Sequence, residues 1–160
     1  MYAQRTSNYR RRAYAVRRGT RPQWERNNLL YPVAVAATTQ SVQSLYTAAK
    51  PIKVTKMRVQ VNFNNSTAAG VIVTTPLYYA VVIVPDGYSP NTISTGGGQM
   101  YEPSQMLIAC GQFVDVQQMY DFWVPTSRRL KEGDSIQFIL ANSTAYNLEA
   151  NIIFSYTQIE

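Results

Sequence analysis

Apolar and polar residues alternate with a period of two along much of this chain, which indicates β-strands rather than helices. The clearest segment is 148–157. Its apolar residues fall on one face and its polar residues on the other, namely Leu148, Ala150, Ile152, Phe154 and Tyr156 against Glu149, Asn151, Ser155 and Thr157. The pattern predicts a strand with one buried and one solvated face.

The segment 53–63 alternates as strongly, but its phase changes once. Ile52 and Val54 occupy even positions, whereas the later apolar residues occupy odd ones, namely Met57, Val59, Val61 and Phe63. A one-residue slip would turn every side chain over. A β-bulge or a strand break near Lys56 is therefore predicted.

The segment 77–84 is apolar at both parities, which predicts a central strand covered on both faces, and Pro85-Asp86-Gly87 closes it with a turn. Further strands are predicted at 32–40, 42–48, 107–116, 120–130 and 134–141, with a long loop at 86–104 and no convincing helix. About eight strands in one domain, residues 27–160, predict an all-β antiparallel sandwich, with an eight-stranded jelly roll as the leading architecture.

Charge is concentrated in residues 1–26, which we interpret as a basic N-terminal arm. Eight arginines minus Glu25 give this arm a net charge of +7, whereas seven basic and eight acidic residues leave the rest at −1. The arginines are Arg5, Arg10, Arg11, Arg12, Arg17, Arg18, Arg21 and Arg26. Such a block of like charge needs an anionic partner.

The residue types in the arm favour nucleic acid as that partner. Arginine alone, without lysine, suits bidentate contact with phosphate. Aromatic residues that can stack on unpaired bases lie between the arginines, and we select Tyr9, Tyr14 and Trp24. An organelle transit peptide, a solubilising tail and a nuclear import signal are alternative interpretations, and import is compatible with nucleic-acid binding.

A second basic group lies in the body, at Lys53, Lys56, Arg58, Arg128, Arg129 and Lys131. If the strands that carry these residues are neighbours, the group forms a patch that extends the binding surface of the arm. Solvated charges or charges that protect a sheet edge are an equal alternative.

Catalytic residue types are scarce. The sequence has no histidine and one cysteine, which excludes the common triads, histidine acid–base pairs and usual zinc sites. The carboxylate pairs Asp115/Asp121 and Glu132/Asp134 lie in or beside predicted turns. We expect no enzyme activity, metal or cofactor, no membrane span, a buried Cys110, and a surface loop rather than a phosphate cradle at glycines 96–98.

Two stretches carry a resemblance to a known family. YRRRAYAVRRGTR (residues 9–21), followed by an all-β body, resembles the capsid proteins of circovirus-like, circular Rep-encoding single-stranded DNA (CRESS-DNA) viruses. LKEGDSI (residues 130–136) is similar to a turn in many viral jelly rolls. The resemblance implies an icosahedral shell of about sixty copies in the virion, assembly in the host nucleus, and packaged single-stranded nucleic acid, DNA favoured over RNA.

The residues themselves leave two other functions open. A monomeric or small-oligomer module could bind single-stranded nucleic acid through the same arm, with the body as a stacking platform. A carbohydrate-binding jelly roll could use exposed aromatic residues, but it leaves the eight arginines unexplained.

Overall fold

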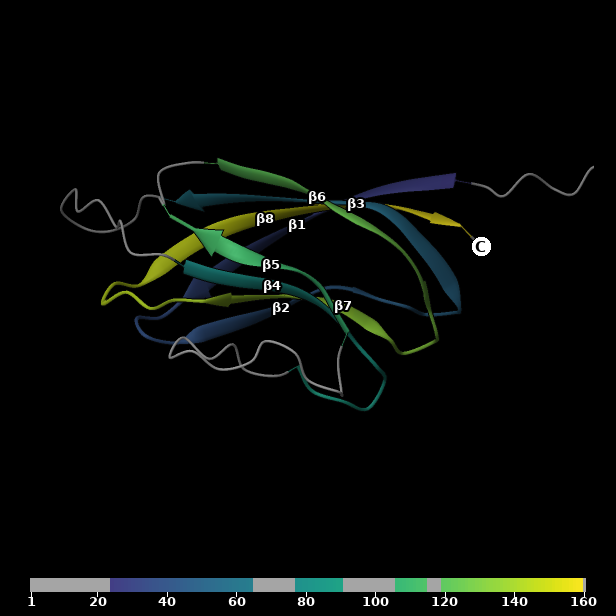
Figure 1. Cartoon of the computed structure of the whole chain (residues 1–160), viewed down its shortest axis with the longest axis horizontal. Helices are drawn as coiled ribbons and strands as arrows, with labels where there is room; N and C mark the ends of the chain where they lie inside the picture. The colour runs from purple at the N-terminus through teal and green to yellow at the C-terminus, as the bar shows by residue number, and fades with distance from the viewer. Residues whose placement is uncertain (1–23, 65–76, 91–105, 115–118, 160) are drawn as a thin grey trace, which may run out of the picture.

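The computed structural model describes residues 24–64, 77–90, 106–114 and 119–159, and these form β-strands joined by turns (Figure 1). Within those ranges there is no helix, and so none that could cross a membrane. The strands are β1 (Trp24–Val35), β2 (Gln40–Thr47), β3 (Ile52–Asn64), β4 (Leu77–Val84), β5 (Met106–Phe113), β6 (Met119–Leu130), β7 (Ser135–Ala141) and β8 (Leu148–Ile159).

The strands form two antiparallel sheets that lie one above the other (Figure 1). Sheet A has the order β1-β8-β3-β6, and sheet B has the order β2-β7-β4-β5. The two halves of the chain pair in nested order, β1 with β8, β2 with β7, β3 with β6, and β4 with β5. The predicted all-β antiparallel sandwich is therefore confirmed.

The alternating segments bury their apolar faces between the sheets. In β8 the five predicted apolar residues are all at most 4% exposed. In β3 the pairing register shifts between Thr55 and Met57, and Lys56 adopts a positive φ of 51°. A bulge at Lys56 thus lets residues on both sides of it face the core, as the change of phase predicts.

Strand β4 is covered on both faces, as predicted. Val81 and Ile83 belong to the core between the sheets, whereas Ala80, Val82 and Val84 belong to a second, smaller apolar cluster. The strand lies between β7 and β5 in sheet B. The second cluster also contains Ile139 and Ala141 of β7, with Leu107 of β5 packed against it, so β4 is apolar on both faces.

The first strand differs from the prediction. It spans Trp24–Val35 rather than 32–40, because β8 pairs with it along its whole length, from Trp24 opposite Ile159 to Val35 opposite Leu148. Pro32 lies inside β1, which is tolerated because β1 is an edge strand of sheet A. The other predicted strands end within three residues of the observed ends. Residues 91–104 of the predicted loop lie outside the described residues.

The prediction for Cys110 is wrong, because its side chain is exposed. It lies on β5, an edge strand of sheet B that has one neighbour, and there it pairs with Ala80. An apolar run on an edge strand does not have to be covered on both faces. The run Leu107–Cys110 therefore has the apolar composition of a buried strand, although its residues are only half-buried or exposed.

Gly133, in the turn between β6 and β7, supports a prediction about stability. Its φ is +86°, and a Cβ at this position would lie 2.5 Å from Cγ of Asp86. We expect Gly133→Ala to lower the free energy of unfolding by about 1–3 kcal/mol in urea denaturation. Gly87→Ala is the control, since Gly87 has a φ of +79° but nothing within 4 Å of its Cβ position. Equal losses in the two variants would contradict the contact with Asp86.

Candidate nucleic-acid interface

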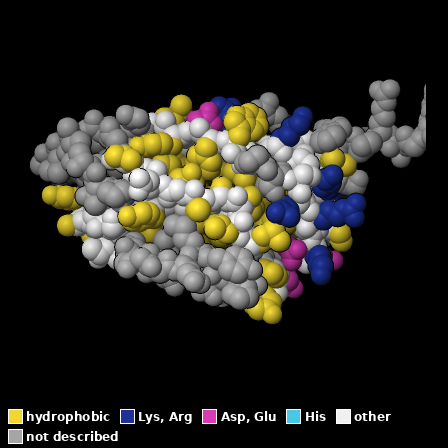
Figure 2. All heavy atoms as spheres, viewed as in Figure 1, with side chains coloured by type: hydrophobic (Ala, Val, Ile, Leu, Met, Phe, Trp, Pro, Cys, Tyr) yellow, Lys and Arg dark blue, Asp and Glu magenta, His cyan; other side chains and the backbone are white. Residues whose placement is uncertain are grey.

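Strands β3 and β6 are neighbours, which fulfils the condition for a basic patch on the body. Lys53 pairs with Arg129, and Val54 pairs with Arg128. Lys131 follows directly in the turn after β6. These exposed residues, Lys53, Arg128, Arg129 and Lys131, form the end patch. Figure 2 shows Lys and Arg side chains gathered at the end of the body where, in Figure 1, β3 begins and β6 ends.

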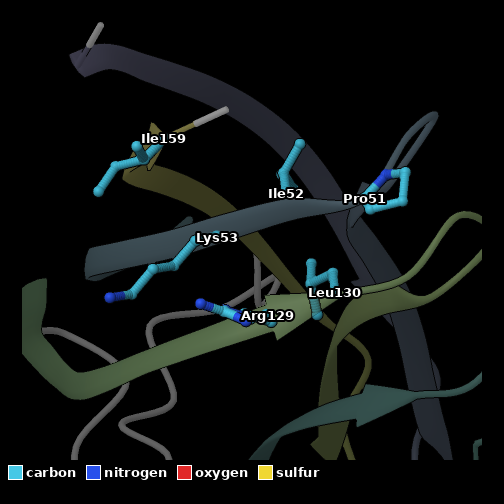
Figure 3. A pocket seen from close by; sticks show the side chains of 6 residues that line it. All are labelled: Pro51, Ile52, Lys53, Arg129, Leu130 and Ile159. Carbon is cyan, nitrogen blue, oxygen red and sulfur yellow. The ribbon is translucent and has the colours of Figure 1, made fainter. Parts of the chain in front are cut away.

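A hollow of about 310 Å³ lies beside the end patch. Its lining consists of Pro51, Ile52, Lys53, Arg129, Leu130 and Ile159. Figure 3 shows Lys53 and Arg129 extending in the same direction from neighbouring strands, with Ile159 across the hollow at the end of β8. Two cations therefore lie next to an apolar wall, an arrangement that suits a ligand with both a phosphate and an apolar or aromatic part.

The chain enters sheet A at the same end. The pairing register forms one row across the sheet, in which Trp24 lies opposite Ile159, Ile159 opposite Lys53, and Lys53 opposite Arg129. Trp24 and Arg129 stand at the two ends of this row, three strand spacings or about 14 Å apart. The start of β1 and the end patch therefore lie at the same end of sheet A.

The predicted contact residues of the arm fall mostly outside the described residues: Arg5, Arg10, Arg11, Arg12, Arg17, Arg18, Arg21, Tyr9 and Tyr14. Trp24 and Arg26 lie in β1, where Arg26 pairs through its backbone with Thr157. The last residues of the range assigned to the arm are thus part of sheet A.

Arg58 lies farther along β3, and its charge is paired. Its Nε donates a hydrogen bond of 2.8 Å to Oδ1 of Asp121, and its Nη2 donates to Oδ2 of the same carboxylate. The hydrogen bond from Arg58 lowers the pKa of Asp121 below its ordinary value. Of the six predicted basic residues, four therefore form the end patch, whereas Arg58 is neutralised by Asp121 and Lys56 lies near it at the bulge.

Trp123 is a residue that the sequence prediction missed. It lies opposite Arg58, with the guanidinium carbon 5.6 Å from its ring centroid, and it is 62% exposed. Lys56, Arg58 and Trp123 line a second hollow of about 220 Å³ together with residues 155–157. A signal was available in the sequence, because Trp123 lies two residues after Asp121 and therefore shares the face of the strand that carries this charged residue.

Two of the four carboxylates considered for catalysis, Asp121 and Asp134, have structural partners, and Glu132 is exposed in the turn after β6. Asp134 accepts hydrogen bonds from the backbone N–H groups of Lys131 at 2.8 Å and of Asp86 at 3.3 Å, which fixes the turn into β7. Asp121 is held by Arg58, and Asp115 lies outside the described residues. In the part of the chain that the structure describes, no group of three or more histidine, cysteine or acidic residues is placed to hold a metal ion.

Comparison with known proteins identifies no family for this chain. No protein-family model matches the chain, and no curated protein sequence matches it.

Proposed function

We propose that this chain is the coat subunit of a small, circovirus-like CRESS-DNA virus. Many copies assemble into a closed icosahedral shell, and the basic arm together with the end patch neutralises packaged single-stranded nucleic acid. The subunit acts in the virion, with assembly in the host nucleus, and the arm doubles as a nuclear import signal. DNA is preferred to RNA on the resemblance of the arm sequence.

The nested strand pairing supports a jelly roll of eight strands for this subunit. In such a fold a long antiparallel hairpin winds into two facing sheets, and the pairs β1/β8, β2/β7, β3/β6 and β4/β5 follow that scheme. Viral coats and lectins both use this architecture. Fold alone therefore does not select the function, whereas the charge of the arm and of the end patch favours a nucleic-acid-binding coat.

The single observation that carries the proposal is the position of the end patch beside the start of β1. The row from Trp24 to Arg129 places body cations where the +7 arm joins the sheet. About sixty arms supply about 420 positive charges, and four end-patch residues per subunit raise this to about 660. The body thus adds more than half of the arm's contribution, at the end of sheet A where β1 begins.

Particle formation tests this function. Subunits stripped of nucleic acid at high salt and then mixed with circular single-stranded DNA at low salt should form uniform closed particles in negative-stain microscopy and light scattering. Replacing the end patch by glutamine (K53Q/R128Q/R129Q/K131Q) should leave particles that package less DNA per subunit. A wild-type chain that stays monomeric at high concentration would reject the coat function and favour a small nucleic-acid-binding module.

A further inference from the structure

We propose that Trp123 is a stacking platform for one base of a bound single strand, with Lys56 beside it to contact an adjacent phosphate. This subsite deepens the proposed function and rests on it, since it assumes that single-stranded nucleic acid reaches the outer face of sheet A. Its ligand class is a nucleobase attached to its sugar-phosphate, and it requires no particular base.

The first support is the unusual exposure of Trp123. The next residue, Val124, is 1% exposed and faces the core, so Trp123 points away from the core on the outer face of sheet A. Tryptophan has the largest apolar ring of any residue, and 62% of its surface remains accessible here. An exposed aromatic ring of this kind is more common in binding surfaces than elsewhere on a protein.

The second support is that neighbouring charges fix the position of the ring. Arg58 lies over Trp123 within the range of a cation–π interaction. Asp121, two residues before Trp123 on the same strand face, holds the Arg58 guanidinium in a two-bond fork. A stacking platform benefits from such preorganisation, because less side-chain freedom is lost when a base binds.

The third support is the chemistry of the hollow next to the ring. At about 220 Å³ it is smaller than typical sites for drug-sized ligands, which begin near 300 Å³, and it suits one sugar-phosphate unit. Hydroxyl-bearing residues Ser155 and Thr157 line it, and so does Lys56 at the β3 bulge. A cation and hydroxyl groups beside an aromatic ring match the parts of a nucleotide.

The fourth support is continuity with the end patch. Lys53 and Arg58 are five residues apart on β3, which corresponds to at most about 17 Å. A single strand of several nucleotides that contacts the end patch can therefore extend along β3 and β6 to Trp123. The subsite lies on the path of a strand that leaves the arm, rather than on a separate surface.

Affinity for strands with and without bases tests the subsite. We would compare oligothymidylate with an abasic deoxyribose-phosphate strand, each of about ten nucleotides, so that backbone charge is matched. Trp123→Ala should weaken oligothymidylate binding by about 5- to 150-fold and change abasic-strand binding less than twofold. Trp123→Phe should retain most of the affinity for oligothymidylate.

Met119→Ala is the matched control, because Met119 lies on the same strand and is also 62% exposed but has no ring. It should change neither affinity. Circular dichroism of each variant checks that the fold is intact.

Three outcomes would overturn the subsite. Equal weakening of both strands by Trp123→Ala would assign Trp123 a general structural role, and no change in either would show that the strand does not reach it. Loss of particle formation with unchanged affinities would make this face, with the exposed pair Leu30 and Ile153, a contact between subunits. If wild-type protein binds neither strand, the proposed function itself fails, and this result is distinct from the other three.

Discussion

Replacing the seven arginines before Trp24 by glutamine should weaken binding of oligothymidylate at 50 mM salt on the order of 10²–10³-fold. The seven are Arg5, Arg10, Arg11, Arg12, Arg17, Arg18 and Arg21. Neutralising about seven phosphates of a single strand contributes about −5 to the slope of log affinity against log salt, and the four end-patch residues add up to about −3, so the wild-type slope should lie between about −5 and −8. In the variant, the end patch alone should give a slope no steeper than about −3. Fluorescence anisotropy of a labelled strand over a salt series measures both quantities.

The matched control replaces the same seven arginines by lysine. This variant keeps the charge, so the salt slope should stay near the wild-type value, whereas affinity should fall by less than about tenfold because bidentate contacts and stacking are lost. A wild-type slope near zero would contradict the role of the arm. An unchanged slope in the glutamine variant would assign the electrostatic contacts to the body instead.

Much of the fold could be predicted from the sequence where burial decides the pattern. The phase change in β3 predicted the bulge at Lys56, and the apolar run of β4 predicted a central strand. The failures concern sheet edges. Pro32 is compatible with β1 only because β1 is an edge strand, and Cys110 is exposed because β5 is one. Edge position depends on strand order, which local sequence does not encode.

The basic residues of the candidate site could be predicted from the sequence, but which of them lie next to one another could not. Basic residues on β3 and β6 were identifiable, yet only the pairing register shows that Lys53 meets Arg129 while Arg58 meets Trp123 and is bridged to Asp121. Asp121 was considered for catalysis only as one half of a carboxylate pair with Asp115, because its cationic partner Arg58 lies 63 positions away in the sequence and could not be identified. Partners that are so far apart in the sequence can be identified only when the pairing of the strands is known.

The largest expected effect on stability is at Phe113, where the two sheets meet. Phe113 ends β5 in sheet B and is 1% exposed, and its ring centroid lies 4.6 Å from that of Tyr79 in the same sheet. Across the sandwich it lies 4.5 Å from Tyr120 and 5.4 Å from Phe63 of sheet A. We expect Phe113→Ala to lower the free energy of unfolding by about 3–5 kcal/mol, as measured by urea denaturation of unassembled subunits.

Two further variants separate the causes of this loss. Phe113→Leu keeps most of the buried apolar volume but removes the ring contacts, so it should cost clearly less than the alanine variant. Tyr88→Ala removes an aromatic ring at a site that is 61% exposed and should change stability by no more than about 0.5 kcal/mol. A loss below about 1 kcal/mol for Phe113→Ala would mean that the sheets are not joined at this ring. A loss of the expected size would remove about a fifth or more of a typical domain's stability, so subunits should also fail to assemble at temperatures where wild-type particles form.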